Sequence, residues 1–187
     1  MKKANYLFSL LAIGFAVLVL FISLQSANSS ELIGKTNLLA SKFYVTKEIL
    51  PDHSLYPLLM VFDRVRLELA DSEKRTYLLV SYSQRRFFYS RKLLEKGNKT
   101  LAFTTLSKAL KYLNQAMEEN IIFFEKQSNR SNLENQTLAF LILENFDEQM
   151  DFIVEQRDQF NNEEKVVLES LCLQSSSLAE KLRKLVQ

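Results

Sequence analysis

The scarcity of glycine and proline constrains this chain more than any other feature. The 187 residues include only three glycines and two prolines. A β-fold of this length needs many tight turns, which depend on those two residues, and a phosphate-cradling loop also needs several glycines. Long stretches without either residue instead favour helices. The sequence therefore predicts an all-α fold and argues against a nucleotide-binding fold.

A long apolar run near the N-terminus predicts a membrane span. Residues 7–24 carry no charge and follow Lys2 and Lys3. A helix of that length extends about 27 Å, close to the hydrocarbon thickness of about 30 Å. The two lysines should stay in the cytoplasm. We therefore expect residues 1–30 to be a signal anchor in a single-pass membrane protein, and residues 31–187 to form an extracytoplasmic domain. Cleavage near Ser29, as in a secretory signal, remains the alternative.

The rest of the chain reads as helices that are separated by short polar turns. Asp52 or Ser54 is expected to cap the helix that follows Pro51, and Gly97 is expected to end the next one. Long helices joined by short loops pack as antiparallel neighbours. The predicted architecture is an N-terminal transmembrane helix followed by an antiparallel helical bundle of about five helices. The expected helices cover residues 31–49, 54–69, 71–96, 100–127, 133–160 and 162–187.

One helical wheel illustrates the predicted core. Residues 133–160 place apolar side chains within an arc of about 120°, which is the width of a core-facing stripe. Acidic residues occupy the adjoining face and spread along the helix axis, so they do not surround a cation. The stripe expected in the core consists of Ala139, Leu143, Phe146, Met150, Ile153, Val154 and Phe160.

Charge cancels over the whole domain but not locally. Residues 72–111 carry a net charge of +8, and residues 112–169 carry −9. One interpretation is attraction between neighbouring helices of opposite sign. The other is a basic face, with Arg85, Arg91 and Lys92, that binds a protein or an anionic envelope partner. Nucleic acid is not an expected partner, because the domain is extracytoplasmic and has no net charge.

Arg86 differs from the other basic residues, because the helical wheel places it in the middle of an apolar stripe. A guanidinium buried without a partner is costly. We therefore expect a carboxylate against it, and Asp63 and Glu68 of the preceding helix are the candidates. The alternative is that the apolar stem is buried while the head reaches water.

The residues that usually carry catalysis are scarce. The chain has one histidine, His53, in a turn, and one cysteine, Cys172, between leucines. Neither can form a metal cluster or a hydrolytic relay alone. We expect no catalytic residue, no metal site and no cofactor. The favoured function is a membrane-anchored module that binds a partner or senses the envelope. The alternatives are an envelope-acting hydrolase or transferase that uses carboxylates, and a structural oligomer; the oligomeric state stays open.

Residues 48–58, EILPDHSLYPL, resemble the opening signature of a bacterial family, domain of unknown function family 5667. The likeness continues through Arg85 and Arg86 to the Lys96-Gly97-Asn98 turn, and it covers residues 48–120. Leu59 and Tyr89 depart from the family pattern, where a lysine and a glutamate are expected. The resemblance implies a helical domain beside a single membrane helix. It implies no chemistry and no catalytic residue.

Overall fold

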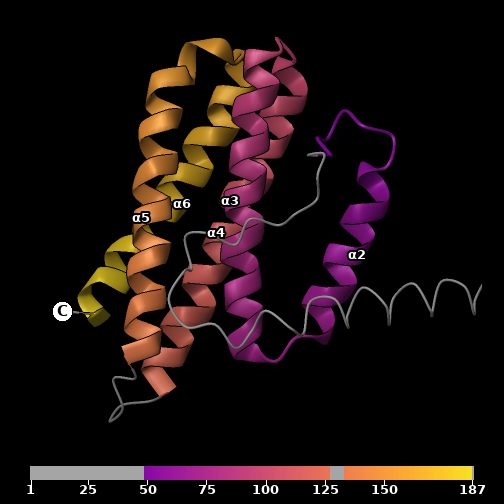
Figure 1. Cartoon of the computed structure of the whole chain (residues 1–187). Coiled ribbons are helices and arrows are strands. Elements are labelled where there is room, and N and C mark those ends of the chain that lie inside the picture. The colour runs from indigo at the N-terminus through magenta and orange to yellow at the C-terminus, as the bar shows by residue number, and fades with distance from the viewer. Residues whose placement is uncertain (1–48, 127–132, 187) are drawn as a thin grey trace, which may run out of the picture. The chain divides into compact units, whose positions relative to one another are not determined.

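The computed structural model describes residues 49–126 and 133–186, and these two ranges are helical without a strand (Figure 1). The predicted all-α class and helical bundle are confirmed for them. No helix in these ranges is long and apolar enough to cross a membrane. The predicted anchor, residues 1–30, and the predicted helix up to residue 48 lie outside the described residues. The helices are α2 (Tyr56–Leu69), α3 (Ser72–Glu95), α4 (Lys99–Lys126), α5 (Leu133–Gln156) and α6 (Asn162–Val186), with a 3₁₀ turn, η1 (Arg157–Gln159), before α6.

Helix α4 forms the centre of the bundle. It packs along α3 and also contacts α5 and α6. Contacts between α3 and α4 pair early residues of one with late residues of the other, as in Arg75 with Glu119 and Ser83 with Ala109, so these two helices are antiparallel. Two apolar clusters fill the interior along α4. The first contains Leu79, Leu113, Met117, Ile142 and Leu182, and the second contains Phe87, Leu106, Leu110, Ile153 and Leu168.

Helix starts are fixed by local side chains. Asp71 accepts a hydrogen bond from Lys74 N at the start of α3 (3.0 Å), and Asn161 and Glu164 form a reciprocal capping box at the start of α6 (2.9 and 3.0 Å). The prediction that Asp52 or Ser54 caps α2 is wrong. The N-cap is Leu55, which has no side-chain cap, and His53 Nδ1 accepts the hydrogen bond of Leu55 N (3.1 Å).

The predicted core stripe of α5 is correct for most positions and wrong for Val154. Ala139, Phe146 and Ile153 are buried, whereas Val154 is 77% exposed. The physical reason is that two amides, Asn145 and Gln149, occupy part of the buried face. Gln149 Nε2 donates to Ser83 Oγ across the bundle (2.9 Å), and this hydrogen bond lets a polar residue be buried.

Gly97 ends α3 as predicted. Its φ of +77° lies in the left-handed region. Gly97 N donates to Leu94 O (2.8 Å), and Asn98 N donates to Leu93 O (2.9 Å). These two bonds form a Schellman motif, which satisfies carbonyls at the helix end. A side chain would fit at this position, because a Cβ added to Gly97 would have no heavy atom within 4 Å. The left-handed backbone conformation is therefore the reason for glycine here.

We expect Gly97→Ala to lower the free energy of unfolding by about 1 kcal/mol, because alanine disfavours positive φ. Gly97→Asn is the matched control and should lose less, since asparagine tolerates this conformation. Chemical denaturation of the full chain in detergent measures both. Equal losses in the two variants would contradict the backbone explanation.

Candidate interaction surface on helix α2

Polar contacts hold α2 against α3. Leu67 is the one fully buried residue of α2. On the inner side of α2, Asp63 forms an ion pair with Arg85 of α3, and Arg86 Nη2 lies 3.6 Å from the same carboxylate oxygen. The Tyr82 hydroxyl donates to the backbone carbonyl of Asp63 (3.3 Å). We call Asp63, Tyr82, Arg85 and Arg86 the Asp63 cluster. It links the two helices by charge and hydrogen bonding, not by apolar area.

Arg86 is buried, with a side-chain exposure of 1%. Its guanidinium lies over the ring of Tyr112 of α4, 4.3 Å from the centroid, and Nη1 donates to the carbonyl of Tyr82 (3.3 Å). Nη2 contacts Met60 Sδ of α2 (2.9 Å), whereas Nε has no hydrogen-bond partner among the described residues. The negative face of the ring and the shared carboxylate therefore stabilise this cation together. The head of Arg86 does not reach water.

Burial lowers the pKa of the Arg85 guanidinium, but the attraction and hydrogen bond of Asp63 outweigh that effect and raise the pKa overall. The pKa of Tyr82 is raised to about 12, first by burial and then by the charge of Asp63. Burial also raises the pKa of Tyr56, and this rise is partly offset by Arg86 and Arg85. Two cations thus share one anion beside neutral phenols. This arrangement fixes α2 in place and presents no group poised for catalysis.

The basic residues of the predicted surface contact different neighbours. Arg85 turns toward Asp63. Arg91 lies 3.5 Å from Glu148 of α5, and its guanidinium lies within 6 Å of the Phe87 and Phe152 ring centroids, at 5.8 and 5.7 Å. Lys92 Nζ lies 4.4 Å from the centroid of Phe88. Each therefore engages a neighbour within the bundle.

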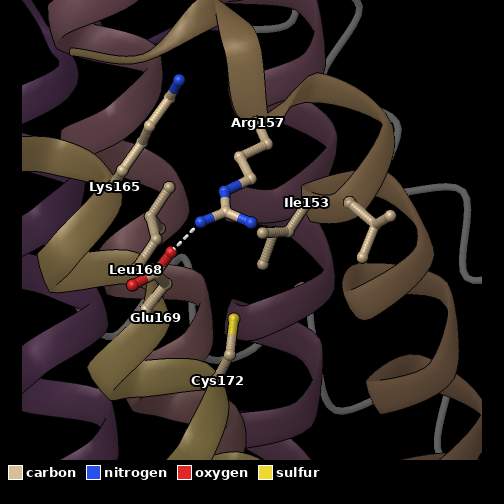
Figure 2. A pocket seen from close by; sticks show the side chains of 7 residues that line it. Ile153, Arg157, Lys165, Leu168, Glu169 and Cys172 are labelled. Carbon is tan, nitrogen blue, oxygen red and sulfur yellow. Dashed lines mark hydrogen bonds and ion pairs between the residues drawn. The ribbon is translucent and has the colours of Figure 1, made fainter. Parts of the chain in front are cut away.

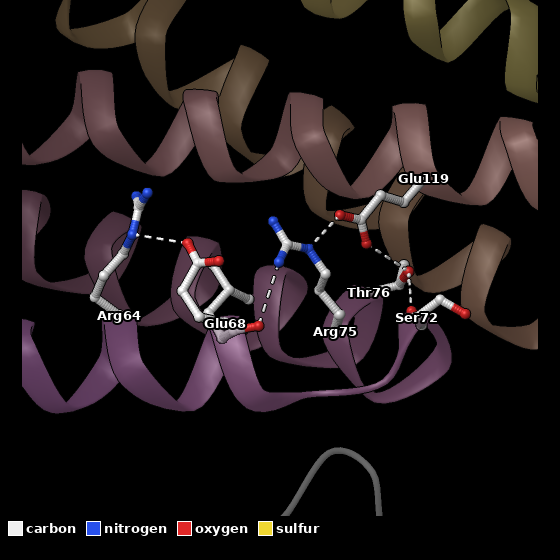
Figure 3. Close-up of polar contacts among 7 residues, drawn as sticks. Arg64, Glu68, Ser72, Arg75, Thr76 and Glu119 are labelled. Atoms are coloured by element: carbon white, nitrogen blue, oxygen red, sulfur yellow. Dashed lines mark hydrogen bonds and ion pairs between the residues drawn. The ribbon is translucent and has the colours of Figure 1, made fainter.

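A second polar link holds the C-terminal end of α2 (Figure 3). Arg75 Nη1 donates to the carbonyl of Leu67 (3.3 Å), one of the last carbonyls of α2, and Nε donates to Glu119 of α4 (2.7 Å). Such a donor satisfies a carbonyl that the helix end leaves without a partner. Glu68, the other candidate partner for Arg86, instead pairs with Arg64 in an exposed contact (3.1 Å).

The opposite side of α2 is apolar and exposed. At 100° per residue its members fall within an arc of about 160°, turned away from Asp63 and Leu67. Val61 is 59% exposed and Leu69 is 69% exposed. Sequence analysis missed this face, although a wheel of residues 56–69 does place apolar residues on both sides of the helix. We call it the outer face of α2, and it consists of Leu55, Leu58, Leu59, Val61, Val65 and Leu69.

Aromatic side chains of α3 adjoin the first turn of α2. The rings of Tyr56 and Tyr89 meet edge to face, with centroids 6.3 Å apart, and the Phe88 ring follows 6.2 Å from that of Tyr89. Phe88 is itself exposed. Tyr89 of α3 therefore packs against the first turn of α2, and Phe88 is an exposed ring beside Tyr89 on α3.

A small depression lies between the end of α5 and α6 (Figure 2). It encloses about 150 Å³ and is lined mainly by apolar groups, including Ile153, Leu168 and Cys172, while an ion pair between Arg157 and Glu169 borders it. Burial, and then the charge of Glu169, raise the pKa of the Cys172 thiol. A protonated thiol is a weak nucleophile. Among the described residues, no three His, Cys, Asp or Glu side chains are arranged to hold a metal ion.

Comparison with known proteins gives one match. The model of the family described as "Domain of unknown function (DUF5667)" matches residues 48–172, which is more than half of the chain. The matched range contains the outer face of α2 and the whole Asp63 cluster. No curated protein and no solved structure matches the sequence.

We expect Asp63→Asn to lower the free energy of unfolding by about 3 kcal/mol, because it leaves the buried Arg86 without a carboxylate. Glu68→Gln is the matched control on the same helix. Its ion pair with Arg64 is exposed, so the expected change is below about 1 kcal/mol. Urea denaturation of both variants measures the difference, and similar losses would contradict the assigned role of Asp63.

The raised pKa of Tyr82 predicts a loss of stability at alkaline pH. An unfolded tyrosine ionises near pH 10, whereas buried Tyr82 ionises at about pH 12. The folded state therefore binds the phenolic proton more tightly. The resulting stabilisation is complete below about pH 10 and is lost as the pH rises through about 12. The free energy of unfolding of Tyr82→Phe should fall less over that interval. Parallel curves for the two proteins would contradict the prediction.

Proposed function

Because the chain belongs to the DUF5667 family, whose description gives no activity, we propose a function from the outer face of α2. The protein is a non-catalytic binding module. Residues 7–24 anchor it in the membrane, and its helical bundle lies on the extracytoplasmic side. The charge-free run behind Lys2 and Lys3 supports the anchor and its orientation.

The observation that carries the binding function is the exposed apolar side of α2. A helix on the surface of a bundle normally turns its apolar residues inward. Here the inner side holds Asp63, and the outer side exposes large residues such as Leu58 and Val61. Contiguous exposed apolar surface with a polar rim is typical of an interaction site. Since charge holds α2 in place, a partner can cover the outer face without displacing the helix.

The arrangement of the acids favours binding over the hydrolytic alternative. General acid–base catalysis needs groups that converge on one substrate. Asp147 instead pairs with Arg183 (2.6 Å), and the neighbouring Glu148 pairs with Arg91 (3.5 Å). The depression beside Cys172 contains a single acid, Glu169, and that acid is paired. These contacts hold neighbouring helices together, and the depression beside Cys172 has no pair of converging carboxylates.

The full chain, produced in a bacterial host with a photoreactive amino acid at Val61, tests this proposal. We expect the chain to stay in the membrane during an alkaline wash, because an apolar span resists extraction. Protease added to spheroplasts should digest the bundle. Illumination should give an adduct at position 61, and mass spectrometry of the peptide measures it.

The matched control carries the photoreactive group at Val166, another exposed valine on a helix. No comparable adduct is expected there. A chain that the alkaline wash releases, or a bundle that protease digests only after cell lysis, would contradict the proposed anchor or its orientation. Equal adduct yields at positions 61 and 166 would contradict the binding role of the outer face.

A further inference from the structure

We infer that the occupant of the outer face of α2 is the lipid surface of the membrane that anchors the chain. This inference rests on the proposed anchor and adds to it a second, peripheral contact. In it, α2 lies in the interface with its outer face toward the acyl chains, while the Asp63 cluster holds the bundle on the opposite side.

The first argument is chain length. Residues 25–48 join the predicted span to the described part of the chain, and α2 is the first described helix after them. Fully extended, that connection reaches at most about 80 Å. The outer face of α2 is therefore tethered within reach of the bilayer surface. A tether of this kind raises the local concentration of lipid around α2, so even a weak contact is occupied.

The second argument is the chemistry of the surface. Interfacial helices bury leucine, valine and phenylalanine below the headgroups and place basic residues at that level. The outer face of α2 offers leucines and valines. Exposed Arg66 lies within the outer face itself, whereas exposed Arg64 lies beyond its Val61 edge and pairs with Glu68.

The third argument is charge complementarity. Arg66 is exposed, and the helical wheel places it within the outer face of α2, between Leu55 and Leu59. Anionic headgroups attract such a cation. A second copy packed on the same face would instead bring its own Arg66 into the contact, and like charges placed together oppose association. Lipid therefore fits this surface better than self-association does.

Fluorescence quenching in proteoliposomes tests the inference. The full chain carries Cys172→Ala to remove the native thiol, and Val61→Cys labelled with an environment-sensitive fluorophore. The vesicles contain phosphatidylcholine and anionic phosphatidylglycerol, part of it brominated on the acyl chains. Val166→Cys on α6 is the matched control, because Val166 is 65% exposed on another helix. We expect quenching at position 61 to exceed that at position 166 by at least about twofold.

Equal quenching at the two positions would overturn the inference. Efficient bismaleimide cross-linking between two copies of Val61→Cys in the same vesicles would also overturn it, because a second copy would then cover the face. Alkaline extraction of the chain separates failure of the anchor from failure of the docking. If the chain is extracted, the labelled protein is added to preformed vesicles. Preferential quenching at position 61 would then still support docking, and its absence would overturn it.

Discussion

The attachment of α2 depends on one carboxylate shared by two arginines. Asp63 pairs with Arg85 and lies 3.6 Å from Arg86, so one negative charge serves two cations. The Arg86 guanidinium lies over the ring of Tyr112, and the negative face of that ring stabilises the second positive charge. Besides the buried Leu67, the inner side of α2 has only half-buried apolar residues, Tyr56 and Met60, so apolar burial contributes less here than it does along α4. Because charge holds this helix, its apolar residues need not face the bundle.

The bundle of α3 to α6 is built on a different principle. Apolar clusters along α4 supply most of its burial, and a few polar side chains connect helices inside them. Ser175 Oγ donates to Asn114 Oδ1 (2.6 Å), and Gln149 donates to Ser83. Buried hydrogen bonds add little net stability, but they penalise other alignments in which a polar group would lose its partner. They therefore select one register among helices that could slide past one another.

Sequence reasoning succeeded where the signal is local. The all-α class and the helix end at Gly97 follow from residue type, and the structure places that end within one residue. It failed where the rotation of a helix about its own axis determines which side chains face the bundle. Residues 56–69 carry apolar groups on nearly every side, so periodicity cannot choose which side faces α3. The choice between Asp63 and Glu68 beside Arg86 depends on the same rotation. Val154 was misplaced because Gln149, a polar residue, occupies the buried face.

The unevenly distributed charges of the chain form ion pairs between helices. Basic residues of α3 and α6 meet acids of α4 and α5, as in Arg75 with Glu119, Lys181 with Glu125 and Arg183 with Asp147. Opposite segments therefore neutralise one another across helix interfaces, where partly exposed pairs guide packing more than they stabilise it. These ion pairs therefore reduce the capacity of the acidic helices to bind a cationic partner. The apolar outer face of α2 is a surface that these ion pairs do not occupy.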